Sequence, residues 1–133
     1  MELQFNYTTP EQSQRLLELG LPVDSADCIL RHYNWADEDL KEENWEYPAI
    51  INKGISPSEA MDMFLDDEYD MTMPCWSVGR LIEIFNLINK QQERFLFWMN
   101  LSRYKITNYV GVFVMALEEL KIHDALDLSK LSK

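Results

Sequence analysis

Glycine and histidine are scarce in this sequence of 133 residues, and their scarcity excludes several common chemistries. The four glycines do not form the phosphate-binding patterns G-x-G-x-x-G and G-x-x-x-x-G-K-[ST], nor the nucleophile pattern G-x-S-x-G. The two histidines, His32 and His123, lie far apart and lack the H-E-x-x-H spacing of a zinc site. Nucleotide chemistry and zinc hydrolysis are therefore disfavoured.

Cysteine and long apolar runs are scarce as well. Cys28 and Cys75 show no C-x-x-C pairing, so the sequence predicts neither a disulfide framework nor a thiolate zinc site. The N-terminus lacks a basic stretch followed by an apolar one, and the longest apolar run, residues 110 to 117, is far shorter than the roughly 20 residues of a membrane helix. We therefore expect a protein of the reducing cytoplasm, neither secreted nor membrane-inserted.

Basic residues are few, 12 against 23 acidic ones, and the imbalance lies in one part of the chain. Residues 1 to 75 hold 17 acidic and 4 basic residues, a net charge of −13, whereas residues 76 to 133 carry +2. A field of this sign repels phosphate backbones and anionic lipid and attracts basic partners. Direct nucleic-acid binding is thus disfavoured, and the alternative to a basic partner is that the acids only provide solubility.

Helix start signals divide the chain. Two helices are predicted to begin after Thr9 and Ser56, because each hydroxyl residue is followed by proline and then by glutamine or glutamate at the third helical position. The first of these helices covers residues 10 to 19 and ends at Gly20. Ser77 precedes a third helix, and apolar spacing predicts a fourth from Gly111. The second helix runs into the acids Asp66, Asp67, Glu68 and Asp70. The helix dipole disfavours negative charge there, and such a conflict sometimes marks a functional site.

Strand-like segments alternate with these helices. One strand is predicted over residues 28 to 35 and a second over residues 45 to 51. Pro48 would confine the second strand to a sheet edge. Residues 71 to 76 read as an extended connection, and residues 94 to 110 as an antiparallel hairpin. We therefore expect a single α+β domain over residues 1 to 133, with about four helices packed on a small, mainly antiparallel sheet. Residues 124 to 133 either extend the last helix or fray as a tail.

Clustered carboxylates suggest a calcium or magnesium site, but the standard calcium loop does not fit. Counting from Asp37 places Glu42 at the glycine position and Pro48 at the bidentate glutamate, and counting from Asp66 places Met71 at the glycine position. Cys28 and His32 share one face of the first predicted strand but lie roughly 13 Å apart, too far for a nucleophile and its base. No catalytic, cofactor-binding or metal residue is assigned, and no cofactor is expected.

Two tryptophans bracket the acid-rich residues 36 to 44, and this bracket is the most specific local feature. Aromatic faces take lysine or arginine stems while carboxylates take their charges, so the bracket suggests a basic partner. The alternative is a hairpin whose two aromatics pack across strands beneath a charged loop. The predicted partner-binding residues are Trp35, Asp37, Glu38, Asp39, Glu42, Glu43, Trp45, Asp66, Asp67 and Glu68.

Two stretches of the sequence carry a family resemblance: residues 9 to 20, TPEQSQRLLELG, and residues 74 to 82, PCWSVGRLI. With the strands and helix that follow, they resemble a group of small proteins, without known activity, from phages, integrated elements and chromosomes of gut bacteria. The resemblance spans most of the chain, and its motifs are helix starts and stops. It implies a small cytoplasmic accessory protein of mobile-element origin, and it carries no catalytic residues.

The sequence favours a noncatalytic protein-interaction module of an inhibitor, antitoxin-like or immunity-like kind that binds a basic partner. Two alternatives stay open. One is a small hydrolase or metal-dependent enzyme with a site assembled from distant segments, using Asp66, Asp67, His32 or Cys28. The other is a self-associating structural protein that buries methionines between subunits, namely Met61, Met63, Met71 and Met73.

Overall fold

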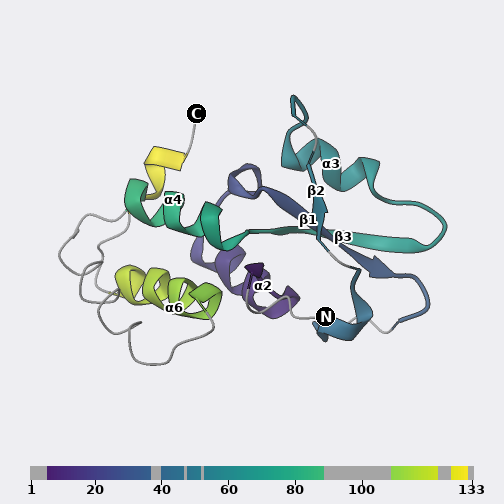
Figure 1. The fold of residues 1–133 in the computed structure, drawn as a ribbon, viewed down its shortest axis with the longest axis horizontal. Coiled ribbons are helices and arrows are strands. Elements are labelled where there is room, and N and C mark those ends of the chain that lie inside the picture. Colours follow the sequence, from purple (N-terminus) through teal and green to yellow (C-terminus); the bar gives the residue numbers. More distant parts are fainter. Residues whose placement is uncertain are drawn as a thin grey trace.

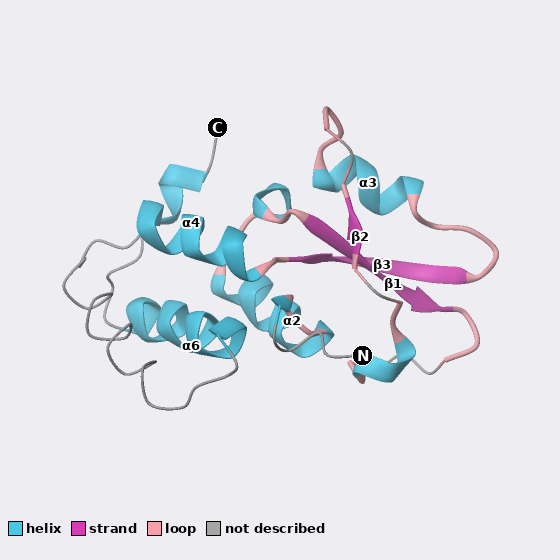
Figure 2. Cartoon of the chain, viewed as in Figure 1, coloured by secondary structure: helices cyan, strands magenta, loops and turns pink. Residues whose placement is uncertain are grey.

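The structure is a computed structural model that describes residues 6–36, 40–46, 48–51, 53–88, 109–122 and 127–131. These residues form four α-helices and a three-stranded antiparallel sheet, which confirms the predicted α+β class (Figure 1). Helices α4 and α6 lie side by side at one end of the molecule, and the sheet lies at the other (Figure 2). No helix within the described ranges is long and apolar enough to cross a membrane.

Helix α2, Pro10–Leu19, has the predicted bounds. The Thr9 hydroxyl accepts from the Gln12 backbone N–H at 3.2 Å, and the Gln12 side chain accepts from the Thr9 N–H at 3.0 Å, which completes the capping box. Gly20 ends the helix at φ 111°, a left-handed conformation that favours glycine. A Cβ atom on Gly20 would also lie 2.9 Å from the end of the Leu128 side chain, which would have to shift.

The other helices begin where the sequence places them, with one small difference. Helix α3 is Pro57–Met63 after the Ser56 cap, and helix α4 is Val78–Ile88 after Ser77. Helix α6, Tyr109–Ile122, begins two residues before the predicted Gly111. Tyr109 and Val110 therefore belong to a helix and not to the predicted hairpin, whose other residues, 94 to 108, lie outside the described residues.

The C-terminal segment is described in part. Residues 124 to 126, 132 and 133 of the segment expected to extend the last helix or fray lie outside the described residues. Residues Leu128–Leu131 form a 3-10 helix, and its partly buried leucines, Leu128 and Leu131, pack against the helical core. The core that they join lies between α2, α4 and α6, and its fully buried side chains include Leu16, Trp76, Leu81, Phe85, Leu117 and Leu120.

The sheet has the strand order β2-β1-β3, with β1 at Cys28–Tyr33, β2 at Ala49–Ile50 and β3 at Tyr69–Cys75. The strand expected over residues 45 to 51 is only Ala49–Ile50: it lies at a sheet edge, as expected, but Pro48 precedes it and is not part of it. Most of residues 71 to 76, expected to be an extended connection, belong to strand β3. This strand pairs with β1 in antiparallel orientation, and the pairing begins with Cys28 opposite Cys75. Pro74 is tolerated because β3 is also an edge strand.

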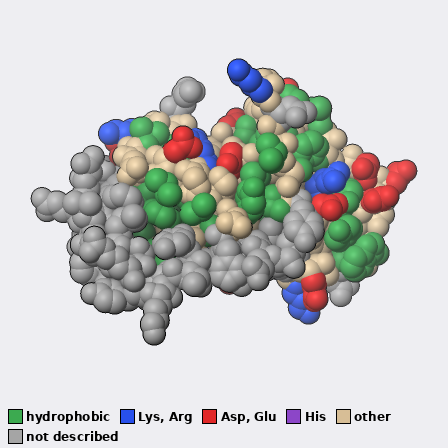
Figure 3. All heavy atoms as spheres, in the orientation of Figure 1, with side chains coloured by type: hydrophobic (Ala, Val, Ile, Leu, Met, Phe, Trp, Pro, Cys, Tyr) green, Lys and Arg blue, Asp and Glu red, His purple; other side chains and the backbone are tan. Residues whose placement is uncertain are grey.

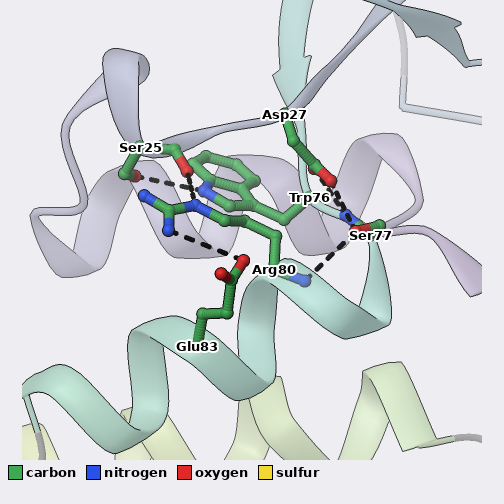
Figure 4. A network of polar contacts seen from close by, with 6 residues as sticks. All are labelled: Ser25, Asp27, Trp76, Ser77, Arg80 and Glu83. Carbon is green, nitrogen blue, oxygen red and sulfur yellow. Dashed lines mark hydrogen bonds and ion pairs between the residues drawn. The ribbon is translucent and has the colours of Figure 1, made fainter.

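A polar network ties the start of α4 to the loop before β1 (Figure 4). The Asp27 carboxylate accepts from the Ser77 N–H at 2.9 Å and from its hydroxyl at 2.5 Å, and the Ser77 oxygen in turn accepts from the Arg80 N–H. The Arg80 guanidinium donates to the Ser25 carbonyl at 2.7 Å, and the Trp76 indole donates to the Ser25 hydroxyl at 3.1 Å. Ser77 thus serves as a helix cap, and the network joins sheet and helices.

Replacing the Ser77 cap should therefore destabilise the fold. We expect Ser77→Ala to lower the free energy of unfolding by about 1–2 kcal/mol, because α4 loses its cap and Asp27 loses a donor. Urea denaturation followed by circular dichroism measures this loss. The matched control is Ser77→Thr, which keeps the hydroxyl and should lose less than half as much; equal losses would show that the hydroxyl is not the stabilising group.

Candidate functional site

A bulge near the end of the β1–β3 pairing arranges the candidate site. His32 pairs with Met71, but the next residue, Tyr33, pairs with Tyr69, so Asp70 is an extra residue in β3. Because successive strand residues point to opposite faces, this extra residue resets the alternation. Tyr69 thereby shares one face of the sheet with Tyr33, while Asp70 reaches His32 on the other face.

The His32 face is closed to solvent. The His32 side chain is fully buried, its Nδ1 lies 2.8 Å from the Asp70 carboxylate, and its ring meets the Trp45 ring edge to face at 4.9 Å. Trp45 is itself 3% exposed. Both residues pack beside a buried cluster that includes Cys28, Leu30, Met73 and Cys75. This face therefore forms a core, with the histidine inside it.

The opposite face carries a guanidinium held between an aromatic ring and a carboxylate. The Arg31 guanidinium carbon lies 4.0 Å from the centre of the Tyr69 ring and 5.8 Å from that of Phe64. Its Nη2 lies 3.5 Å from Glu46, and the Tyr69 hydroxyl donates to the same carboxylate. Glu46 therefore offsets the charge of Arg31 directly.

The aromatic side chains continue outward from Tyr69 to the solvent. The Tyr33 ring lies 5.4 Å from Tyr69, and the Trp35 ring stacks on Tyr33 at 5.2 Å with an angle of 18° between the planes. Trp35 is 71% exposed although one of its faces contacts Tyr33. An exposed indole held in this way offers a rigid apolar contact with little loss of side-chain entropy on binding.

Three acids lie beside this aromatic stack, and we call Asp66, Asp67 and Glu68 the acid turn. Asn34, the neighbour of Trp35, holds this turn in place: its N–H donates to the Glu68 carbonyl at 2.9 Å, and its side chain donates to the Asp67 carbonyl. The acid turn, Arg31 and Tyr69 line a pocket of about 440 Å³. Segments separated by about thirty residues in the sequence are thus combined in one surface.

The acid turn does not conflict with a helix dipole. Helix α3 ends at Met63, and Phe64 follows it as the C-cap, so the three acids lie beyond the helix. Within the turn, the Asp66 carboxylate accepts from the Glu68 N–H at 2.8 Å. The early end of the helix therefore resolves the conflict that the sequence suggested.

The predicted partner-binding residues are distributed unevenly. The exposure that a partner requires is present at Trp35 and in the acid turn, and absent at Trp45. The two tryptophans cannot act as a pair, because one contacts His32 and the other contacts Tyr33 on the opposite face of β1. Glu43 is exposed in a 3-10 helix. Asp37, Glu38, Asp39 and the Glu42 side chain lie outside the described residues.

Of the residues suggested for an enzyme, Cys28 and His32 are buried, whereas Asp66 and Asp67 are exposed in the acid turn. Burial raises the pKa of Cys75 to about 12 and also raises that of Cys28, which disfavours thiolates at neutral pH. The described part of the chain holds no group of three or more His, Cys, Asp or Glu side chains arranged to bind a metal ion. Neither a thiol nucleophile nor a metal site is therefore supported by this geometry.

The methionines suggested for self-association do not form one exposed surface. Met63, in α3, is 61% exposed, whereas Met73 is buried and Met71 packs against the same cluster on the His32 face. Met61 is half-buried near the other face, where its carbonyl accepts from Thr72 at 2.9 Å. The four side chains thus lie in different environments.

Comparisons of this chain with protein-family models, with curated proteins and with solved structures found no match. The resemblance to proteins of phages and gut bacteria stays a prediction. Its two sequence stretches correspond here to the capped helix α2 and to the junction of β3 with α4, which are structural features.

The two tryptophans should differ sharply when each is replaced by alanine. We expect Trp45→Ala to lower the free energy of unfolding by about 3–5 kcal/mol, because it leaves a large cavity beside His32. Trp35→Ala should cost less than about 1 kcal/mol, because only its stacking on Tyr33 is lost. Urea denaturation of both variants tests this difference, and equal losses would contradict the burial described for Trp45.

The two thiols should be unreactive in the folded protein at neutral pH. Their raised pKa values keep them protonated, and burial hides them from reagents. We expect Ellman's reagent to modify the native thiols at less than about a tenth of the rate seen in guanidinium chloride. Rapid modification of one thiol in the native protein would instead favour the thiol-enzyme alternative.

Proposed function

We propose that this protein is a noncatalytic interaction module that binds a basic segment of a partner protein at the surface formed by Trp35 and the acid turn. One observation carries the proposal: the bonds from Asn34 to the Asp67 and Glu68 carbonyls hold an exposed aromatic ring beside three exposed acids. An exposed aromatic ring and exposed acids held at the same end of the sheet suit a lysine or arginine side chain, whose stem is apolar and whose end is charged.

The charge of the chain supports the same partner chemistry. The net charge is −11, and residues 1 to 75, which include the whole described sheet, carry −13. A field of this sign attracts a basic protein over several ångströms and speeds association at low salt. The same field opposes direct binding of nucleic acid. An inhibitor, antitoxin-like or immunity-like protein that covers a basic surface has these properties.

The proposed location is the reducing cytoplasm. Cys28 and Cys75 are opposite residues on adjacent strands, and both are free thiols. Two cysteines so placed stay reduced without difficulty where glutathione and thioredoxin act. An accessory role there also agrees with the predicted resemblance to proteins of phages and integrated elements.

Binding of a fluorescein-labelled hexalysine peptide, followed by fluorescence anisotropy, tests the proposal. We expect a dissociation constant that rises between about 20 mM and about 200 mM salt, because the attraction is electrostatic. The double variant Asp67→Asn/Glu68→Gln should bind about threefold to tenfold more weakly, since two carboxylates of the site are lost.

The matched control is Glu11→Gln/Glu18→Gln, which removes the same charge from exposed positions of α2. Helix α2 approaches the Cys75 end of β3, and the acid turn lies at the other end of that strand. The control should change the affinity less than about twofold. Equal weakening by both variants, or no binding by the unaltered protein, would overturn the proposed site.

A further inference from the structure

The sheet end already holds one guanidinium between an aromatic ring and a carboxylate. Arg31 lies over the Tyr69 ring at 4.0 Å, and its Nη2 lies 3.5 Å from the Glu46 carboxylate, which also accepts from the Tyr69 hydroxyl. A planar cation is thus placed on an aromatic face while a carboxylate lies near one end of it, and its buried Nε has no hydrogen-bond partner among the described residues. This combination stabilises a guanidinium more than a simple charge pair does.

The outer end of the same aromatic stack has similar groups without a cation. Trp35 stacks on Tyr33 through one face and is 71% exposed, and Asn34 holds the Asp67 and Glu68 backbone beside it. In the part of the chain that the structure describes, no cation lies over the Trp35 ring or forms an ion pair with the acid turn. Figure 3 shows acidic side chains next to apolar ones at this end of the molecule.

We propose that the group bound at this surface is an arginine side chain of the partner, stacked on the exposed ring of Trp35. This inference rests on the proposed function and names the ligand chemistry of the same site. The bound guanidinium would extend the existing series Arg31, Tyr69, Tyr33 and Trp35 by one further cation, with the acid turn supplying the countercharge.

Arginine fits this surface better than lysine for three physical reasons. Its guanidinium is planar and stacks on a ring, it presents paired N–H groups to a carboxylate, and it is more weakly hydrated than an ammonium group. An ammonium group loses more hydration when it approaches an indole face and gains no stacking. A flat, exposed tryptophan beside carboxylates therefore discriminates between the two basic side chains.

Labelled hexapeptides of arginine, lysine and citrulline test the inference. Citrulline has a planar side chain of similar shape without the charge, so it separates stacking from electrostatics. We expect hexaarginine to bind the unaltered protein about fivefold more tightly than hexalysine, and hexacitrulline to bind more weakly than either. Trp35→Leu should bring the arginine and lysine affinities within about twofold of each other.

Ile50→Ala is the matched control, because Ile50 is 73% exposed and lies on β2, away from the aromatic stack. This variant should keep the preference for arginine. Circular dichroism checks that both variants fold, which the exposure of both positions favours.

The outcomes distinguish this inference from the proposed function. Equal binding of hexaarginine and hexalysine, weakened by Asp67→Asn/Glu68→Gln, would overturn the arginine inference and leave a basic-partner site. A preference for arginine that persists in Trp35→Leu would overturn the placement on Trp35. Hexacitrulline binding as tight as hexaarginine, or no binding of either cationic peptide, would overturn both proposals.

Discussion

The extra residue in β3 is the constraint on which the sheet end depends. With regular alternation after Met71, Asp70 would face Arg31 and Tyr33, and Tyr69 would face His32. The bulge reverses this order, so that a carboxylate meets the buried histidine and a tyrosine ring meets the guanidinium. A shift of one residue moves every following side chain to the other face, so one local irregularity determines both the core contact and the aromatic stack.

Asn34 connects the end of β1, next to the bulge, with the acid turn at the surface. It directly follows Tyr33, the last residue of β1, and its two hydrogen bonds reach the acid turn that precedes β3. The end of one strand is thereby fastened to the start of its neighbour, and the aromatic and acidic groups are positioned before any partner arrives. Preorganisation of this kind reduces the entropy that binding must overcome, so a small surface can still bind specifically.

Local signals in the sequence predicted the helices well and the sheet end poorly. The capping residues at Thr9, Ser56 and Ser77 act within a few positions of the chain, so their effect is readable without the fold. Residues 71 to 76 are expected to be an extended connection, because the residue before Pro74 avoids helical geometry, and pairing with β1 makes most of this stretch a strand. The sequence suggests that Trp35 and Trp45 act together because they flank the same acid-rich segment. In the structure they lie on opposite faces of the sheet, where Trp45 contacts His32 and Trp35 contacts Tyr33.

The charge distribution and the aromatic stack act over different distances, and together they favour one direction of approach. The sheet belongs to residues 1 to 75, which carry −13, whereas helices α4 and α6 at the other end of the molecule (Figure 2) come from the remainder of the chain, which carries +2. If the proposed basic partner binds, such an asymmetry orients it toward the sheet before contact, over about one Debye length. Contact would then depend on the shape and charge of the side chains at the sheet end. The Glu46 carboxylate offsets the charge of Arg31, so Arg31 would repel an incoming cation less than a guanidinium without a countercharge. In the proposed function, long-range charge would bring a basic partner to the sheet end, and Trp35 with the acid turn would provide the short-range selection.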